Sequence, residues 1–201
     1  YRKASFRLPE LADIAVLRFN TRGTCSTMGC SMGAFGDGIT ERFDFEAALQ
    51  FANERNLPNI YILGWSFGTE LILRFGATEQ NRNLYKGGIL LSPPLRRATD
   101  ENLEYWATHG SDLLALVPEL DDFLTPEPAR ERFSIAPQIK VEAVEGARHL
   151  WVGEKYVQIV HNRIASYVLG EDIPLPTTYT GEMADAGNVV MHEHNNGVTT
   201  S

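Results

Sequence analysis

Residues 60–75 read IYILGWSFGTELILRF, with the pattern G-x-S-x-G at positions 64–68. An apolar run precedes this pentapeptide and a helix-like run follows it, so we expect a strand, a sharp turn and a helix in succession. Such a turn exposes its central side chain, Ser66, as a nucleophile, and it needs glycines because it leaves no room for side chains beside the serine. Two glycines can flank a serine by chance, but the strand and the helix favour the nucleophile.

The helix after Ser66 is expected to contribute to the same site. Backbone N–H groups at the start of a helix, together with the positive end of its dipole, favour a negative charge that develops nearby. We therefore expect the N–H of Phe67 to be one donor of an oxyanion hole.

The composition is that of a soluble globular protein with one domain. The chain has 201 residues, of which 43% are hydrophobic and 22% charged, and its net charge of −8 argues against a nucleic-acid partner. Five of the 26 acidic side chains lie in residues 170–201, which hold no Lys or Arg. No apolar run is long enough to span a bilayer, so we expect a small molecule, and neither nucleic acid nor a membrane, as the partner.

The two cysteines, Cys25 and Cys30, lie in one loop rich in Gly, Ser and Met. Two thiols are too few for a disulfide framework and their spacing is not C-x-x-C, so we expect free thiols in a reducing compartment, the cytoplasm. No histidine lies near them in the sequence, so we expect no metal site and no cofactor. The chain starts with Tyr1 and not with Met, which predicts a fragment or a processed product.

The chain alternates between predicted strands and predicted helices. The strands are expected at residues 13–19, 59–63, 88–92, 113–117 and 140–144. The helices are expected at residues 2–11, 40–56, 67–77, 99–108, 127–133 and 154–168. Strands that are apolar throughout and separated by helices indicate an α/β fold, a mainly parallel sheet with helices on both faces. We expect a core at residues 1–169 and a flexible acidic tail at 170–201.

A serine nucleophile needs a general base, and the base needs an orienting acid. His149 follows the last predicted strand, and catalytic groups collect at the carboxyl ends of strands in an open α/β sheet. The other four histidines are less suitable. His109 precedes a strand, His161 is expected on the polar side of the last helix, and His192 and His194 lie in the tail.

The acid is expected after the strand at 113–117, where residues 118–126 read PELDDFLTP. Asp121 and Asp122 are adjacent there and point in different directions. One of them can cap the next turn while the other contacts His149. The local pattern alone leaves both residues open.

The order of a serine, an acid and a histidine, each after its own strand, resembles the α/β-hydrolase superfamily. In that family an acid four residues before a proline is a common arrangement after the penultimate strand, and Asp122 stands four residues before Pro126. The resemblance therefore implies a triad of Ser66, Asp122 and His149, with Asp122 preferred over Asp121.

Three further segments are similar to small bacterial esterase-like members of the family. Residues 17–23 (LRFNTRG) and 41–44 (ERFD) look like the Arg-Gly loop and the helix after it, and residues 146–149 (GARH) look like the histidine loop. The resemblance covers residues 1–169. The family's first strands, and the loop that carries half of its oxyanion hole, have no counterpart here, so we expect an N-terminally truncated member of this fold.

The connection between residues 92 and 112 is short, so we expect no large lid domain and an open pocket roofed by residues 95–106. Trp65, Trp106 and Trp151 are candidate walls of a substrate pocket, and ordinary core packing is the alternative for each of them.

The function that these patterns favour is a serine hydrolase that cleaves a small-molecule acyl ester or thioester through an acyl-enzyme. The alternative is a catalytically weak or inactive binding or scaffold protein on the same fold, since a fold does not determine a function. A phosphate or nucleotide site in the Gly29–Gly38 loop is disfavoured, because the loop lacks both G-x-x-x-x-G-K-[ST] and a fitting G-x-G-x-x-G.

Overall fold

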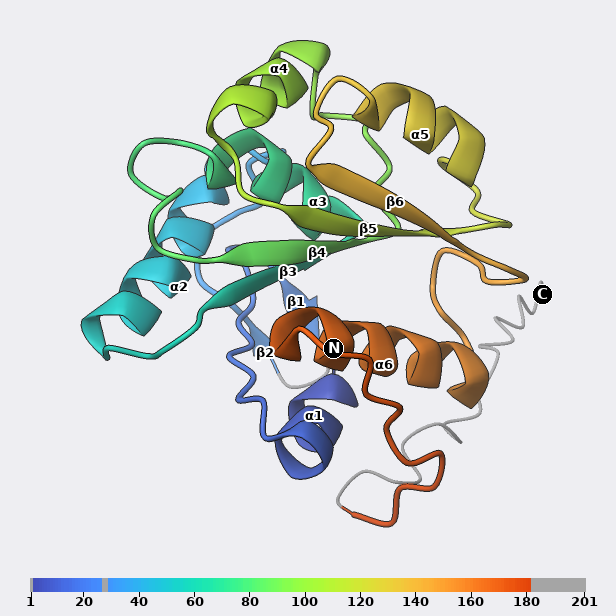
Figure 1. The fold of residues 1–201 in the computed structure, drawn as a ribbon. Helices are drawn as coiled ribbons and strands as arrows, with labels where there is room; N and C mark the ends of the chain where they lie inside the picture. Colours follow the sequence, from blue (N-terminus) through green and yellow to red (C-terminus); the bar gives the residue numbers. More distant parts are fainter. Residues whose placement is uncertain (1, 27–28, 182–201) are drawn as a thin grey trace, which may run out of the picture.

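A computed structural model describes residues 2–26 and 29–181 of the chain (Figure 1). Its centre is a sheet of four parallel strands in the order β3-β4-β5-β6. The strands are β3 (Tyr61–Trp65), β4 (Gly87–Leu91), β5 (Leu113–Pro118) and β6 (Ile139–Val144). They correspond to four of the five predicted strands, with ends shifted by one or two residues.

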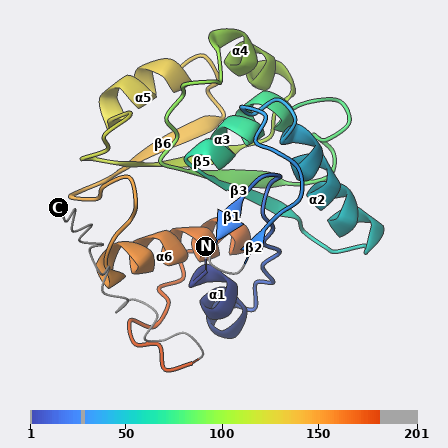
Figure 2. The ribbon, with the colours of Figure 1, turned by 180° about the vertical axis from the view of Figure 1, so that it is seen from behind.

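Helices cover both faces of this sheet (Figures 1 and 2). On one face lie α1 (Ala4–Ala12) and α6 (Glu154–Leu169). On the other lie α2 (Arg42–Glu54), α3 (Phe67–Leu71) with its π-helical continuation η1 (Ile72–Gly76), α4 (Asp100–His109) and α5 (Pro126–Phe133). Two apolar clusters, one on each face, hold the layers together. The predicted fold class is therefore confirmed.

The helix ends follow from local sequence signals. The N–H of Thr99 donates to the side chain of Asn102 at 3.0 Å and so caps the start of α4. Pro126 begins α5, where its missing N–H and fixed φ are suited to the first turn. Gly170 ends α6 in the left-handed region, with φ of 79°. Each of these signals therefore sets one terminus of its helix.

Residues 13–19, which were predicted to form a buried strand, form no strand in the structure. Leu17 is 50% exposed and Phe19 45% exposed, while Ile14 and Val16 pack partly against the α1–α6 cluster. A strand needs a neighbouring backbone to bond to, and β3, at the edge of the sheet, pairs only with β4 among the described strands. The apolar pattern alone therefore predicted the wrong structure here.

The apolar stripe of α2 also differs from a simple prediction. The sequence predicts a buried stripe of Phe43, Ala47, Ala48, Phe51 and Ala52, but both phenylalanines are exposed. Of that stripe only Ala52 is buried, together with Phe45 and Leu49, which the prediction did not include. Both faces have helical periodicity, and only the larger continuous contact with the sheet determines which one is buried.

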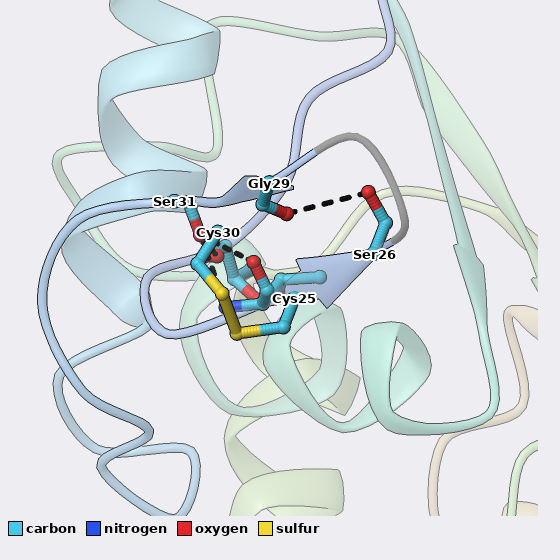
Figure 3. The surroundings of a disulfide bond; sticks show 7 residues. Cys25, Ser26, Gly29, Cys30 and Ser31 are labelled. Carbon is cyan, nitrogen blue, oxygen red and sulfur yellow. Dashed lines mark hydrogen bonds between the residues drawn. A yellow bond between two sulfur atoms is a disulfide. The ribbon is translucent and has the colours of Figure 1, made fainter.

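In the loop rich in Gly, Ser and Met that holds the two cysteines, β1 (Cys25–Ser26) and β2 (Gly29–Cys30) form a short antiparallel hairpin. We call this segment, which continues to Gly38, the glycine-rich loop. A disulfide joins Cys25 to Cys30 across this hairpin (Figure 3). The prediction of free thiols is wrong, because the hairpin places the two residues opposite each other, with 4.0 Å between their Cα atoms. The argument for a reducing compartment, which depended on free thiols, is thereby removed.

The described part of the predicted tail is packed against the core. Leu175 is buried in the α1–α6 cluster, and its N–H donates to the side chain of Asn162 at 3.1 Å. Tyr179 donates to Glu10 on α1 at 2.8 Å. The chain after α6 thus contacts the helices at Leu175 and Tyr179, and residues 182–201, with His192 and His194, lie outside the described residues.

In the part of the chain that the structure describes, no helix has the length and apolar character needed to cross a bilayer.

Candidate active site

Ser66 lies in the tight turn between β3 and α3. Its backbone has φ of 50° and ψ of −114°, a conformation that non-glycine residues rarely adopt. The turn is held by hydrogen bonds from the Ser66 N–H to the Leu91 carbonyl and from the Thr69 N–H to the Ser66 carbonyl, both at 2.9 Å. A Cβ at Gly64 would lie 2.6 Å from the backbone of Gly68, so glycine is required there. The structure therefore presents Ser66 as the sequence pattern predicts.

Three side chains at the carboxyl edge of the sheet form a continuous hydrogen-bonded chain. The Oγ of Ser66 lies 2.9 Å from Nε2 of His149. Nδ1 of the same imidazole lies 3.0 and 3.1 Å from the two carboxylate oxygens of Asp121. The His149 and Asp121 side chains are 8% and 2% exposed, so their contact is shielded from water. This is the geometry of a nucleophile, a base and an orienting acid.

The acid at His149 is Asp121, and the choice of Asp122 is wrong. Asp122 is exposed, whereas Asp121 also accepts the backbone N–H of Phe123 at 2.8 Å. One carboxylate thus caps its own turn and contacts the histidine, where we expected two residues to divide these roles. The spacing to Pro126 does not determine which side chain points inward.

Long-range backbone contacts explain the orientation of this loop. The N–H of Glu119 donates to the Val144 carbonyl, and the N–H of Leu120 donates to the Ala147 carbonyl, both at 3.0 Å. These bonds extend the pairing of β5 and β6 beyond the strands and orient the chain so that Asp121 faces His149.

The backbone of His149 is fixed by two side chains that the sequence analysis did not assign to this role. The carbonyl oxygen of His149 accepts the Ser92 hydroxyl at 3.1 Å and the indole N–H of Trp65 at 3.0 Å. Ser92 is buried and directly follows β4, so its place at a strand end was the signal that could have identified it. Both residues are therefore positioning groups for the histidine.

The three tryptophans predicted to line a pocket fall into two groups. Trp106 is fully buried in the core between α4 and the sheet, and its indole donates to the Ser111 carbonyl at 3.0 Å, so its prediction as a pocket wall is wrong. Trp65 and Trp151 line a cavity of ≈ 300 Å³ on the α6 side of the sheet. The other described residues that line this cavity are Arg2, Lys3, Leu91, Leu150, Val157, Val160 and His161.

His161 was expected on the polar side of the last helix, but it is buried. Burial, together with the positive charges of Arg7 and Lys3, lowers the pKa of His161 to about 4, so the imidazole is neutral at pH 7. His109 lies on α4, where it stacks on Tyr105. Among the described histidines, only His149 contacts both a hydroxyl and a carboxylate.

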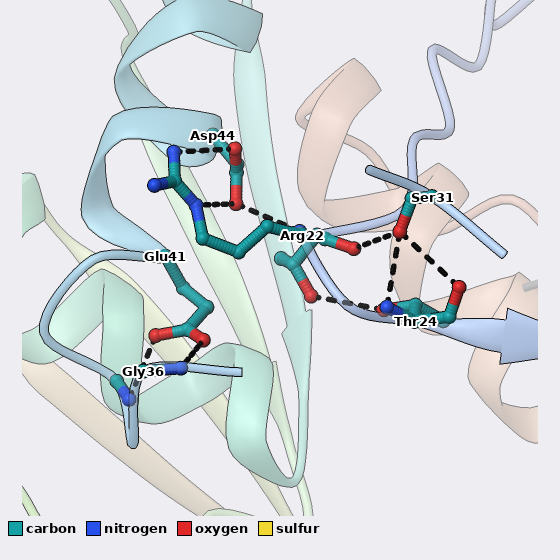
Figure 4. Close-up of polar contacts among 8 residues, drawn as sticks. Arg22, Thr24, Ser31, Gly36, Glu41 and Asp44 are labelled. Carbon is teal, nitrogen blue, oxygen red and sulfur yellow. Dashed lines mark hydrogen bonds and ion pairs between the residues drawn. The ribbon is translucent and has the colours of Figure 1, made fainter. Parts of the chain in front are cut away.

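Two buried glutamates hold the loops beside the Ser66 turn. Both carboxylate oxygens of Glu41 accept backbone N–H groups of the glycine-rich loop, from Gly36 and from Gly38 (Figure 4). Glu70 on α3 accepts the N–H groups of Arg96, Arg97 and Ala98. Both side chains are fully buried, and such carboxylates are stable only when they are hydrogen-bonded in this way.

The Arg-Gly loop is attached to α2 by a bidentate ion pair. The guanidinium of Arg22 donates to both carboxylate oxygens of Asp44, each at 2.9 Å, and its backbone N–H donates to one of them (Figure 4). These hydrogen bonds hold the pKa of the Asp44 carboxyl below its usual value. Asp37 pairs with Arg97 and so joins the glycine-rich loop to the loop that follows β4.

Aromatic rings flank the serine and the histidine. Phe67, the residue after the nucleophile, packs against Phe35 with ring centroids 5.4 Å apart. Phe123 packs edge-on against His149 at 4.5 Å. The described residues contain no cluster of three or more His, Cys, Asp or Glu side chains arranged to hold a metal ion.

Comparisons with known proteins bear on the fold. No family model and no curated protein matches this sequence. A solved α/β serine hydrolase homologue from Coxiella burnetii is 19% identical, with a TM-score of 0.57 over 76% of this chain and 66% of that chain. An esterase from Pyrococcus furiosus is 17% identical, with a TM-score of 0.58 over 72% and 68% of the two chains. An esterase domain from a Rhodothermus marinus protein is 18% identical, with a TM-score of 0.52 over 70% and 74%.

The chain thus spans about two thirds of the length of the first two of these structures. At identities below 20% the similarity concerns the fold. The chain has an α/β-hydrolase-like fold, as the resemblance in the sequence predicted.

Proposed function

We propose that this protein is a serine hydrolase that cleaves small-molecule acyl esters or thioesters through an acyl-enzyme. The observation that carries the proposal is the hydrogen-bonded chain from Ser66 through His149 to Asp121. Esterases among the structures that share the fold are consistent with it.

In the first half of the proposed reaction, Ser66 Oγ bonds to the carbonyl carbon of the ester while His149 Nε2 takes the hydroxyl proton. The carbonyl π electrons move to the oxygen, and we propose that the N–H of Phe67, at the start of α3, stabilises that negative charge. Asp121 stabilises the imidazolium. The intermediate collapses, the bond to the leaving group breaks, and His149 donates its proton to the departing alcohol or thiol.

In the second half, a water molecule loses a proton to His149 and its oxygen bonds to the acyl carbon. The new intermediate expels Ser66 Oγ, which regains a proton from His149, and the carboxylic acid is released. The enzyme returns to its starting state, so atoms and charge balance over the cycle without a cofactor.

The backbone of Ser66 favours this proposal over a binding protein that merely retains the fold. A non-glycine residue at positive φ costs on the order of 1–3 kcal/mol, and such residues cluster at functional sites. Ser92 and Trp151, beside the histidine loop, also have positive φ, at 49° and 53°.

A kinetic comparison of two serine variants tests the proposal. With 4-nitrophenyl acetate, Ser66→Ala is expected to lower kcat/KM by about 10⁴-fold or more with an unchanged melting temperature. Ser134→Ala, an exposed serine at the end of α5, is the matched control and is expected to keep full activity. Equal activity of wild type and Ser66→Ala, or no turnover of any acyl ester by the folded wild type, would overturn the proposal.

A further inference from the structure

We propose that the enzyme prefers acyl esters whose acyl group carries a carboxylate, and that Arg96 recognises this negative charge. The inference rests on the proposed hydrolase function and adds a substrate class to it. It is carried by the placement of the Arg96 guanidinium on the ring that contacts His149.

Arg96 and His149 contact the same aromatic ring, that of Phe123. Its guanidinium carbon lies over the Phe123 ring, 5.4 Å from the centroid, and the same ring contacts His149 with centroids 4.5 Å apart. Because both contacts share Phe123, the guanidinium lies at most about 10 Å from the imidazole, one Debye length at 0.1 M salt. Its charge is therefore within range of an anionic group on a substrate bound beside His149.

Two other arginines of this region are already engaged, and Arg96 is not. Arg97 pairs with Asp37, and Arg74 donates to the Gly38 carbonyl at 3.0 Å. Within residues 2–26 and 29–181, the Arg96 guanidinium has no hydrogen bond and no ion pair, and Phe123 is its one aromatic contact. All five of its N–H donors are thus available to a ligand.

Glu70 fixes the backbone of Arg96 by hydrogen bonds. This buried carboxylate accepts the Arg96 N–H at 2.7 Å and the next two N–H groups at 3.1 and 2.6 Å. Glu70 lies one helical turn after Ser66 on the same helix, so it fixes the Arg96 loop relative to the nucleophile. A fixed backbone limits the positions that the Arg96 side chain can take, so less conformational entropy is lost when it binds a ligand.

The chemistry of a guanidinium selects the ligand. Its planar fork matches the two oxygens of a carboxylate, and stacking on a ring leaves the edges of the fork open to them. The two buried acids of this region are already engaged, Asp121 with His149 and the Phe123 N–H, and Glu70 with three backbone N–H groups. An acyl chain with a terminal carboxylate would satisfy this cation while its ester carbonyl lies at Ser66.

The test compares neutral and anionic esters with the same leaving group. The substrates are 4-nitrophenyl butyrate and the 4-nitrophenyl half-esters of succinate and glutarate, and the quantity measured is the ratio of kcat/KM for anionic over neutral acyl groups. The variants are Arg96→Gln, Arg96→Lys and a control, Arg55→Gln. Arg55 also lies over a phenylalanine, at 4.5 Å from the Phe51 centroid, but at the far end of α2.

For the wild type we expect a ratio above one that falls as salt is raised from 0.05 to 0.5 M. Arg96→Gln is expected to lower the ratio about ten-fold, Arg96→Lys to lower it less because the charge remains, and Arg55→Gln to leave it unchanged.

Two outcomes would overturn the inference while leaving the hydrolase proposal intact: a wild type that hydrolyses neutral and anionic esters equally well, or an Arg96→Gln variant that keeps the wild-type ratio. Failure of the folded wild type to hydrolyse any of the three esters would overturn the hydrolase proposal itself, and the inference with it.

Discussion

Replacement of Asp121 by Asn removes the charge beside His149 and keeps the shape of the side chain. The carboxylate lies 3.0 Å from Nδ1, and the Asp121 side chain is 2% exposed, so the imidazolium formed during catalysis would lose a shielded partner. At an effective dielectric constant of 20, a charge pair at this distance is worth about 5 kcal/mol, which corresponds to about four powers of ten in kcat. Asn can still accept the Phe123 N–H, so the turn is expected to fold.

Asp122→Asn is the matched control, because it makes the same change one residue along, at an exposed position. We expect it to keep kcat for 4-nitrophenyl acetate within about three-fold of wild type. Both variants would be assayed under saturating substrate, with circular dichroism and thermal melts to confirm folding. If Asp122→Asn lost activity and Asp121→Asn kept it, the assignment made from the structure would be refuted.

Two further predictions concern stability. His161 has a pKa of about 4 in the fold and an ordinary value of 6.5, so it stabilises the fold fully above pH 6.5 and loses this contribution as the pH falls towards 4. The free energy of unfolding, measured by chemical denaturation, is expected to decrease from pH 7 to pH 4 in the wild type. In His161→Gln this decrease is expected to be smaller by up to about 3 kcal/mol, and equal decreases in the two proteins would contradict the burial argument. Reduction of the Cys25–Cys30 disulfide is expected to cost at most about 2 kcal/mol, since the bridged residues have a sequence separation of only 5. Because the disulfide contacts no triad residue, a large loss of kcat in the Cys25→Ser, Cys30→Ser double variant would show a coupling that the structure does not contain.

The Ser66 turn and the sheet could be predicted because their sequence signals are local. The apolar run before Ser66, the glycines around it and the helical run after it are contiguous in the sequence. The same holds for β4 and β5, whose residues are all buried and therefore all apolar or small. A parallel arrangement of the strands follows because a helix lies between each apolar run and the next.

The features that were predicted wrongly depend on contacts between segments that are distant in the sequence. Asp121 faces His149 because the loop after β5 bonds to the loop after β6, and no spacing between Asp122 and Pro126 encodes that contact. Residues 13–19 have the composition of a strand, but composition does not reveal whether an unpaired backbone lies beside them. Trp106 is an interior residue of α4, and an aromatic side chain has the same sequence signature in a core as in a pocket wall.

The most direct test of the central claim, that Ser66 is the nucleophile, is covalent labelling with a fluorophosphonate followed by peptide mass spectrometry. An activated serine attacks the phosphorus and displaces fluoride, and the adduct remains on Oγ. We expect one adduct per chain, on the peptide that contains Ser66, with none in Ser66→Ala and a greatly slowed reaction in Asp121→Asn. Absence of labelling in the folded wild type, or an adduct on another serine, would contradict the claim.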